Sequence, residues 1–118
     1  MYARRLGDRW KSTNPYRSLL SAGVVLAGGS DAPITPVDPL AGIRAAANHP
    51  NPDQRIWGND ACAMFTTTAA YSLGLEMLIG RVAPGFAADL TVLSADPRSD
   101  SSARILAAYV SGELCWKA

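Results

Sequence analysis

Asp31 is the residue whose position in this sequence best suits catalysis. It follows an apolar run, Val24 to Ala27, that closes in small residues, and Ala32-Pro33 comes directly after it. The small side chains before Asp31 would let a metal ion or substrate come close to its carboxylate. Such a position is typical of a catalytic group at the carboxyl end of a barrel strand. The alternative for Asp31 is a side chain that caps a turn or a helix.

Histidine and cysteine, which are common zinc ligands, are scarce in this sequence. It has one histidine, His49, and two cysteines, Cys62 and Cys115, that lack metal-ligand spacing. We expect His49 to be an exposed loop residue rather than a ligand. The apolar surroundings of the cysteines favour reduced thiols in the core of a cytoplasmic protein, and a disulfide is the alternative.

Length and charge narrow the class of protein. The 118 residues correspond to one ordinary domain, and the formal net charge is +1. The densest basic cluster is Arg4, Arg5, Arg9 and Lys11, which we interpret as the solvated face of a helix rather than a nucleic-acid footprint. No apolar run approaches the ~20 residues that span a membrane. We therefore expect neither a nucleic acid nor a membrane as partner.

The first half of the sequence predicts one helix, strand, loop and helix of an α/β fold. Asn14 and Pro15 have the types that start a helix, and Gly23 has the type that ends one. Val24–Ala27 is apolar without alternation, which predicts a parallel strand covered on both faces. Asp38-Pro39 predicts the start of a second helix. The apolar stripe of that helix is Leu40, Ile43, Ala46 and Ala47.

A Pro/Asn/Asp-rich connection at 48–58 leads into short helices. Asn59 or Asp60 is predicted to cap the first of them, which turns Ala61, Met64 and Phe65 inward. A second short helix, 69–73, is predicted to end at Gly74. Trp57 is expected to be an aromatic packing anchor, with a cover over a barrel mouth as the alternative.

The last third of the sequence has β signals. Pro84-Gly85 predicts a type II turn, and 89–93 alternates as a strand does. Two further strands, 105–110 and 113–116, flank Ser111-Gly112 and predict a terminal β-hairpin.

Three segments together resemble the amidohydrolase superfamily. Residues 84–93, with Asp96-Pro97, resemble its closing signature, PG-x-x-ADL-x-VL-x-x-DP. Residues 29–33, with 38–40, resemble the eighth barrel strand and following loop of the large branch that includes N-substituted formamide deformylase-like enzymes. Residues 65–71 resemble the helical linker of the family. The likeness spans 6–116, and it departs from the family at Leu78 and Ile79, which are apolar where charged residues are common.

The resemblance implies an α/β fold that is incomplete as a domain. Residues 1–50 would be the last β/α unit of a metal-dependent (β/α)8 barrel of the TIM type, 51–79 a helical linker, and 80–118 part of the flanking β-sandwich. One β/α unit cannot close an eight-stranded barrel. The chain thus resembles the last quarter of a larger amidohydrolase that begins here at an internal methionine.

The resemblance also implies a function for Asp31. It matches the barrel aspartate that contacts the metal and moves a proton from the attacking water to the leaving nitrogen, with Ser30 and Ala32 shaping the pocket floor. The implied cofactor is a divalent metal, zinc by expectation, held only in the complete enzyme.

The implied partners are a missing amino-terminal barrel segment or a second chain, an amide-like small-molecule substrate, and further copies in a homo-oligomer. The alternative function is a catalytically silent fragment or assembly module. An upstream coding segment with a His-x-His motif would separate the two.

Overall fold

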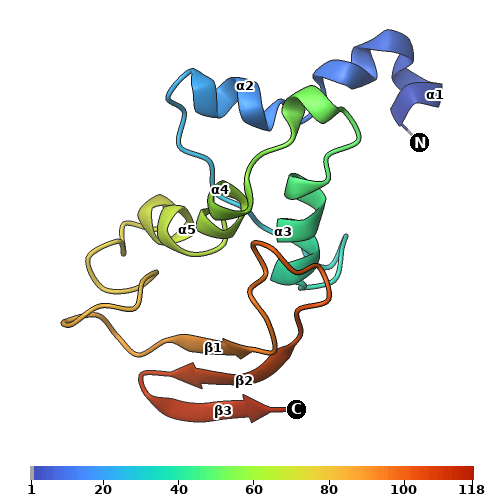
Figure 1. Ribbon diagram of the computed structural model, residues 1–118. Helices are drawn as coiled ribbons and strands as arrows, with labels where there is room; N and C mark the ends of the chain where they lie inside the picture. Colours follow the sequence, from blue (N-terminus) through green and yellow to red (C-terminus); the bar gives the residue numbers. More distant parts are fainter. Residues whose placement is uncertain (1) are drawn as a thin grey trace.

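The computed structural model describes residues 2–118, with no account of the Tyr2 side chain. It measures 49 × 31 × 27 Å along its principal axes, with the helices in one part and a three-stranded sheet in the other (Figure 1). The elements in chain order are the helices α1 (Tyr2–Leu6), η1 (Gly7–Ser12), α2 (Tyr16–Ser21), α3 (Pro39–Ala47), η2 (Pro52–Gln54), α4 (Gly58–Ala63) and α5 (Thr67–Ser72), then the strands β1 (Leu90–Leu93), β2 (Ile105–Val110) and β3 (Glu113–Lys117). No helix of the described part is long and apolar enough to cross a membrane.

The amino-terminal helices carry the basic cluster on their surface. Arg4, Arg5, Arg9 and Lys11 are all exposed, as the sequence predicts. The Lys11 ammonium lies 3.6 Å from the Asp8 carboxylate, on a face open to water. A surface pair of this kind contributes little to stability.

The segment after α2 does not form the predicted strand. Gly23 ends that helix in the left-handed region, at φ +78°, as expected. Residues 24–31, however, pair with no strand among the described residues, and Val24 and Val25 are exposed. The prediction of a covered parallel strand is wrong for this structure, because a strand is defined by neighbours that are far away in sequence or absent from the chain. Two hydrogen bonds to residues distant in sequence hold the segment instead: Gly28 N–H donates to Met64 O at 2.7 Å, and the Thr68 hydroxyl donates to Leu26 O.

The core lies between α3 and α4. Asp38 caps α3 as predicted, since its carboxylate accepts the Ala41 N–H at 2.9 Å. Three of the four residues of the predicted α3 stripe are buried, whereas Ala47 is only partly covered. Residues of the α4 region and partly buried sheet residues pack against this stripe. The buried cluster is Leu40, Ile43, Ala46, Ile56, Ala61 and Met64.

The linker helices begin slightly earlier than their predicted caps. Trp57, rather than Asn59 or Asp60, is the residue before α4. Trp57 is 71% exposed and stacks only with the Arg17 guanidinium, 5.6 Å from its ring centroid, so the expectation of a packing anchor is wrong. The turn after α5 is as predicted, with Gly74 at φ +69°.

The sheet confirms the predicted β region. Its order is β1-β2-β3, antiparallel throughout. Phe86 N–H donates to Ala83 O at 3.2 Å around a turn with Gly85 at φ +89°, which agrees with a type II turn. Ser111 and Gly112 both have positive φ, at 51° and 84°, as a two-residue hairpin turn requires.

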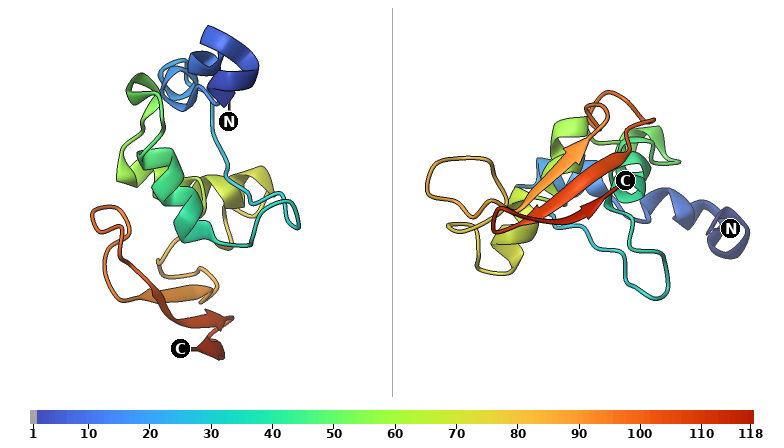
Figure 2. Two further views of the ribbon diagram at one scale, coloured as in Figure 1. Left: turned by 90° about the vertical axis from the view of Figure 1, so that its right-hand side faces the viewer. Right: turned by 90° about the horizontal axis from the view of Figure 1, so that it is seen from below.

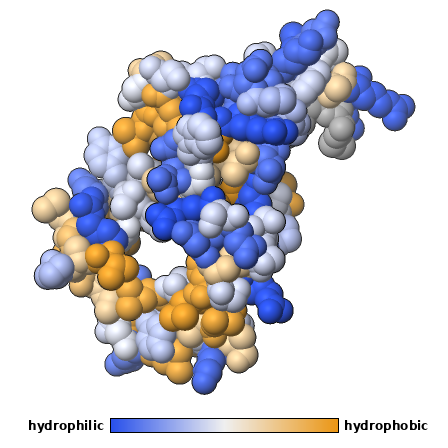
Figure 3. All heavy atoms as spheres, in the orientation of Figure 1, coloured by the Kyte–Doolittle hydropathy of each residue, from blue (hydrophilic) through white to orange (hydrophobic). Residues whose placement is uncertain are grey.

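Few contacts join the sheet to the helices. A groove of about 480 Å³ separates the two parts, and apolar side chains of both line it. The left-hand view of Figure 2 shows the sheet lying below the helices, and the surface view shows hydrophobic residues gathered around the hollow and over the sheet (Figure 3). The structure is therefore a small mixed α/β assembly with much apolar surface open to water.

Candidate functional site

Asp31 lies at an exposed turn. Its φ of +55° falls in the left-handed region, which aspartate adopts more readily than most residues other than glycine. Its carbonyl oxygen accepts the Ile34 N–H at 2.9 Å, so the backbone rather than the side chain closes the turn. Its carboxylate forms no hydrogen bond or ion pair with any residue in 2–118. The carboxylate is therefore available to a ligand, and the interpretation of Asp31 as a side-chain cap has no support.

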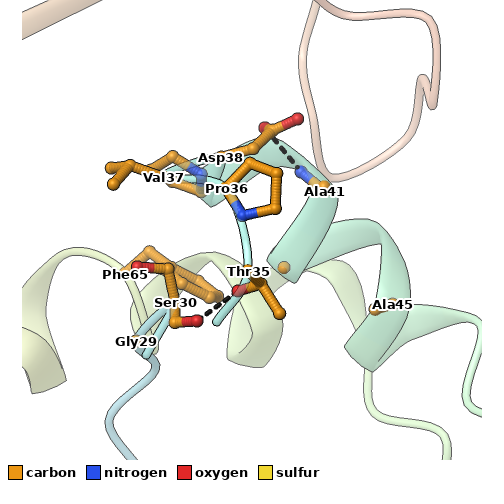
Figure 4. A pocket seen from close by; sticks show the side chains of 11 residues that line it. Gly29, Ser30, Thr35, Pro36, Val37, Asp38, Ala41, Ala45 and Phe65 are labelled. Carbon is orange, nitrogen blue, oxygen red and sulfur yellow. Dashed lines mark hydrogen bonds between the residues drawn. The ribbon is translucent and has the colours of Figure 1, made fainter. Parts of the chain in front are cut away.

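A pocket of about 480 Å³ opens beside the Asp31 turn, between residues 29–30, the 35–38 loop and α3 (Figure 4). Ser30 lines this pocket, whereas Asp31 and Ala32 do not. Thr35 also lines it, and its hydroxyl donates to Ser30 O. The remaining wall is formed mainly by small or apolar groups, namely Gly29, Pro36, Val37, Pro39, Ala41, Gly42, Ala45 and Phe65. Such a pocket suits an apolar substituent of modest size.

His49 is buried, 5% exposed, and the prediction that it lies exposed in a loop is wrong. Its ring meets Tyr16 edge-on at 5.5 Å between centroids, and its Nδ1 accepts the Asn51 N–H at 3.1 Å. Arg55 Nε donates to its carbonyl oxygen at 3.0 Å. The chain after α3 turns back onto α2, and this reversal covers the histidine. His49 thus has a packing role beside Tyr16.

The described residues do not form a metal site on their own. They contain no group of three or more His, Cys, Asp and Glu side chains that could hold an ion. Asp31 supplies one carboxylate, and His49 is engaged with α2. A catalytic zinc site needs about three protein ligands besides water. Any metal contact of Asp31 would thus depend on ligands from outside this chain.

The two cysteines differ in their surroundings. Cys62 is half-buried, and this burial raises the pKa of its thiol, opposed in part by the positive charge of Arg98. Cys115 is exposed on β3, so the expectation of a core thiol is wrong for it, because no layer covers that strand in 2–118. Both are free thiols, as the sequence interpretation favoured over a disulfide.

Arg98 forms an ion pair within the loop after β1 and links this loop to α4 through Asn59. Arg98 donates to both carboxylate oxygens of Asp96 at 2.6–3.0 Å and reaches Asn59 Oδ1 at 3.3 Å. The hydrogen bonds from Arg98 lower the pKa of Asp96 to about 2. A Cβ on Gly58 would lie 2.3 Å from Arg98 O, so the backbones of α4 and this loop are in direct contact at Gly58. In the sequence Asp96-Pro97 is only part of a family motif, whereas in the structure Asp96 holds the Arg98 side chain in place.

Comparison with known proteins gives consistent matches. The family described as Amidohydrolase family matches residues 1–114. YtcJ of Bacillus subtilis, which carries the name amidohydrolase, is 41% identical over 104 residues, and Protein LONG AFTER FAR-RED 3 of Arabidopsis thaliana is 34% identical over 125; these alignments cover 79% and 94% of this chain. Imidazolonepropionase of Cereibacter sphaeroides is 38% identical over 92 residues, 77% of this chain.

A solved structure agrees with these matches. The crystal structure of an amidohydrolase from Thermotoga maritima superimposes with a TM-score of 0.71 at 31% identity, over 85% of this chain and 25% of that one. The chain spans about one fifth of the sequence relatives, 20% to 22% of their length.

Proposed function

The chain belongs to the amidohydrolase family, and from this membership we propose that it is the carboxyl-terminal part of a metal-dependent enzyme that hydrolyses non-peptide C–N bonds. Asp31 is the catalytic residue of this proposal. The observation that carries the proposal is the carboxylate of Asp31, which is free of partners in 2–118 and lies at a backbone-closed turn beside a pocket. In that place a carboxylate can exchange protons with a substrate without first breaking an internal hydrogen bond.

The proposed chemistry is general base and then general acid catalysis by one group. The Asp31 carboxylate takes a proton from water as the water oxygen bonds to the substrate's carbonyl or imine carbon. The resulting carboxylic acid then gives this proton to the leaving nitrogen as the C–N bond breaks. Proton transfers of this kind contribute about 10²- to 10⁴-fold in rate.

A divalent metal, zinc in this proposal, would lower the pKa of the attacking water. The described residues form no group of three or more metal-ligating side chains, so they do not fit a metal on their own. The remaining ligands would come from an amino-terminal barrel segment or from a second chain. Residues 1–50 would then be the last β/α unit of the barrel and 80–118 part of the sandwich.

The finer proposal concerns branch and substrate. Residues 29–33 and 38–40 support the large branch with N-substituted formamide deformylase-like enzymes, which implies a small amide-like substrate. The mostly apolar wall beside Asp31 supports a substrate with an apolar substituent. We place the enzyme in the cytoplasm on the interpretation of its free thiols.

The alternative is a catalytically silent fragment or assembly module. The observation that favours it is exposed apolar surface: Val24, Val25 and much of β3 lie open to water. Such surface suits assembly whether or not Asp31 is active. An upstream coding segment with a His-x-His motif supports the enzyme, and an upstream region without one supports the module.

The test compares two aspartates in the protein joined to its upstream segment. Asp31→Asn should lower turnover of a panel of small amides by about 10²- to 10⁴-fold while leaving much of the bound metal in place. Asp89→Asn is the control, because Asp89 Oδ1 accepts the Ser111 N–H at 2.8 Å in the β2–β3 turn and has a structural role. Its loss should cost about 1 kcal/mol of stability and little turnover per folded molecule. An equal fall in both variants at equal metal content would refute the role of Asp31.

A further inference from the structure

The ring of Phe65 lies between two glycines from separate parts of the chain. A Cβ on Gly28 would lie 2.7 Å from Phe65 Cζ, and a Cβ on Gly42 would lie 2.3 Å from that atom. Both distances are shorter than Cβ contacts in real proteins, so the ring tip occupies space that only glycine leaves open on either side. Gly42 belongs to α3, and Gly28 belongs to the segment that ends at Asp31. Figure 4 shows the Phe65 side chain beside Gly29 and Ser30.

Neighbours of Phe65 bind the same segment. Gly28 N–H donates to Met64 O at 2.7 Å. The Thr68 hydroxyl bridges Leu26 O and Ala63 O, the latter at 2.8 Å. Because residues 24–31 have no strand ladder in the described structure, these contacts and the Phe65 ring determine where the segment lies.

We infer that Phe65 is a positioning residue for Asp31. The ring keeps Gly28 at a set distance from α3. Asp31 lies only three residues after Gly28, so a shift of Gly28 also moves Asp31. A smaller side chain would let Gly28 approach α3 and would change where the carboxylate points. The importance of this placement for catalysis rests on the proposed function. The packing of the ring between the two glycines is independent of that proposal.

The test is nuclear magnetic resonance of the labelled 118-residue chain. Phe65→Ala should speed hydrogen exchange of the Gly28 amide by roughly tenfold or more, because the bond to Met64 O then opens more often. It should also shift the Asp31 carboxyl resonance and leave the amides of the β2–β3 hairpin unchanged. Phe86→Ala is the matched control: it removes the other of the two phenylalanines, which is also half-buried and lies under the Arg81 guanidinium. We expect it to leave the Gly28 and Asp31 signals in place.

A second pair of variants decides the matter if Phe65→Ala unfolds the chain. Gly42→Ala should displace the ring and move the Gly28 and Asp31 signals. Adding Phe65→Leu should restore them, because leucine lacks the Cζ and Cε atoms that the new methyl would meet. Unchanged Gly28 and Asp31 signals in Phe65→Ala, or no restoration by Phe65→Leu, would overturn the inference. Neither result bears on the proposed function, which depends on turnover by Asp31→Asn.

Discussion

Ile43→Ala should destabilise the chain far more than the same change at Ile34. Ile43 is 5% exposed in the cluster between α3 and α4, whereas Ile34 is 78% exposed in the loop after Asp31. The substitution removes three carbons, or about 2.4 kcal/mol at about 0.8 kcal/mol for each buried methylene. A residual cavity adds to this loss, and the better helix propensity of alanine returns about 0.4 kcal/mol. We therefore expect Ile43→Ala to lower the free energy of unfolding by about 2 to 3 kcal/mol.

The measurement is urea unfolding followed by the helical circular dichroism signal. With a slope of about 1.5 kcal/mol per molar urea, the midpoint for Ile43→Ala should fall by roughly 1.3 to 2 M. Ile34→Ala should change the free energy by no more than about 0.5 kcal/mol, as surface substitutions usually do. Equal midpoints for the two variants would refute the assignment of the core to the α3–α4 contact.

Three further predictions follow from the site and the surface. The isolated chain should bind zinc or manganese without a stoichiometric site in calorimetry; a site of micromolar affinity or better that Asp31→Asn abolishes would contradict this expectation. Because apolar side chains and sheet edges lie open to water, light scattering should show self-association, or melting should occur at low temperature; a monodisperse monomer with a cooperative melt above ~65 °C would argue against it. Carbon-13 titration of the Asp96 carboxyl should give a pKa of about 2 that rises toward its usual 3.8 in Arg98→Ala. The pKa of Asp96 is lower in the folded than in the unfolded chain, so the stabilisation by this pair is present above pH 3.8 and is lost as the pH falls through about 2. An unchanged pKa of Asp96 in Arg98→Ala would disprove the pairing.

The elements that depend on nearby residues were predictable. The α3 helix follows from Asp38, whose carboxylate caps a backbone N–H three residues on, and from an apolar stripe with helical period. The hairpin follows from Ser111-Gly112, since few residue pairs adopt positive φ twice in succession. The amidohydrolase membership was also accessible, because its signatures are short runs of fixed spacing.

Tertiary structure alone decided the features that depend on distant residues. The apolar run Val24–Ala27 has strand composition, but backbone pairing needs a neighbour that the described chain does not place there. His49 is buried because the chain after α3 turns back onto α2, and no residue beside His49 reveals that reversal. Phe65 has its place between Gly28 and Gly42 for the same reason. The sequence by itself predicts Asp31 as the residue that could do chemistry, whereas the free carboxylate of Asp31 and the packing around Gly28 depend on contacts between segments that only folding brings together.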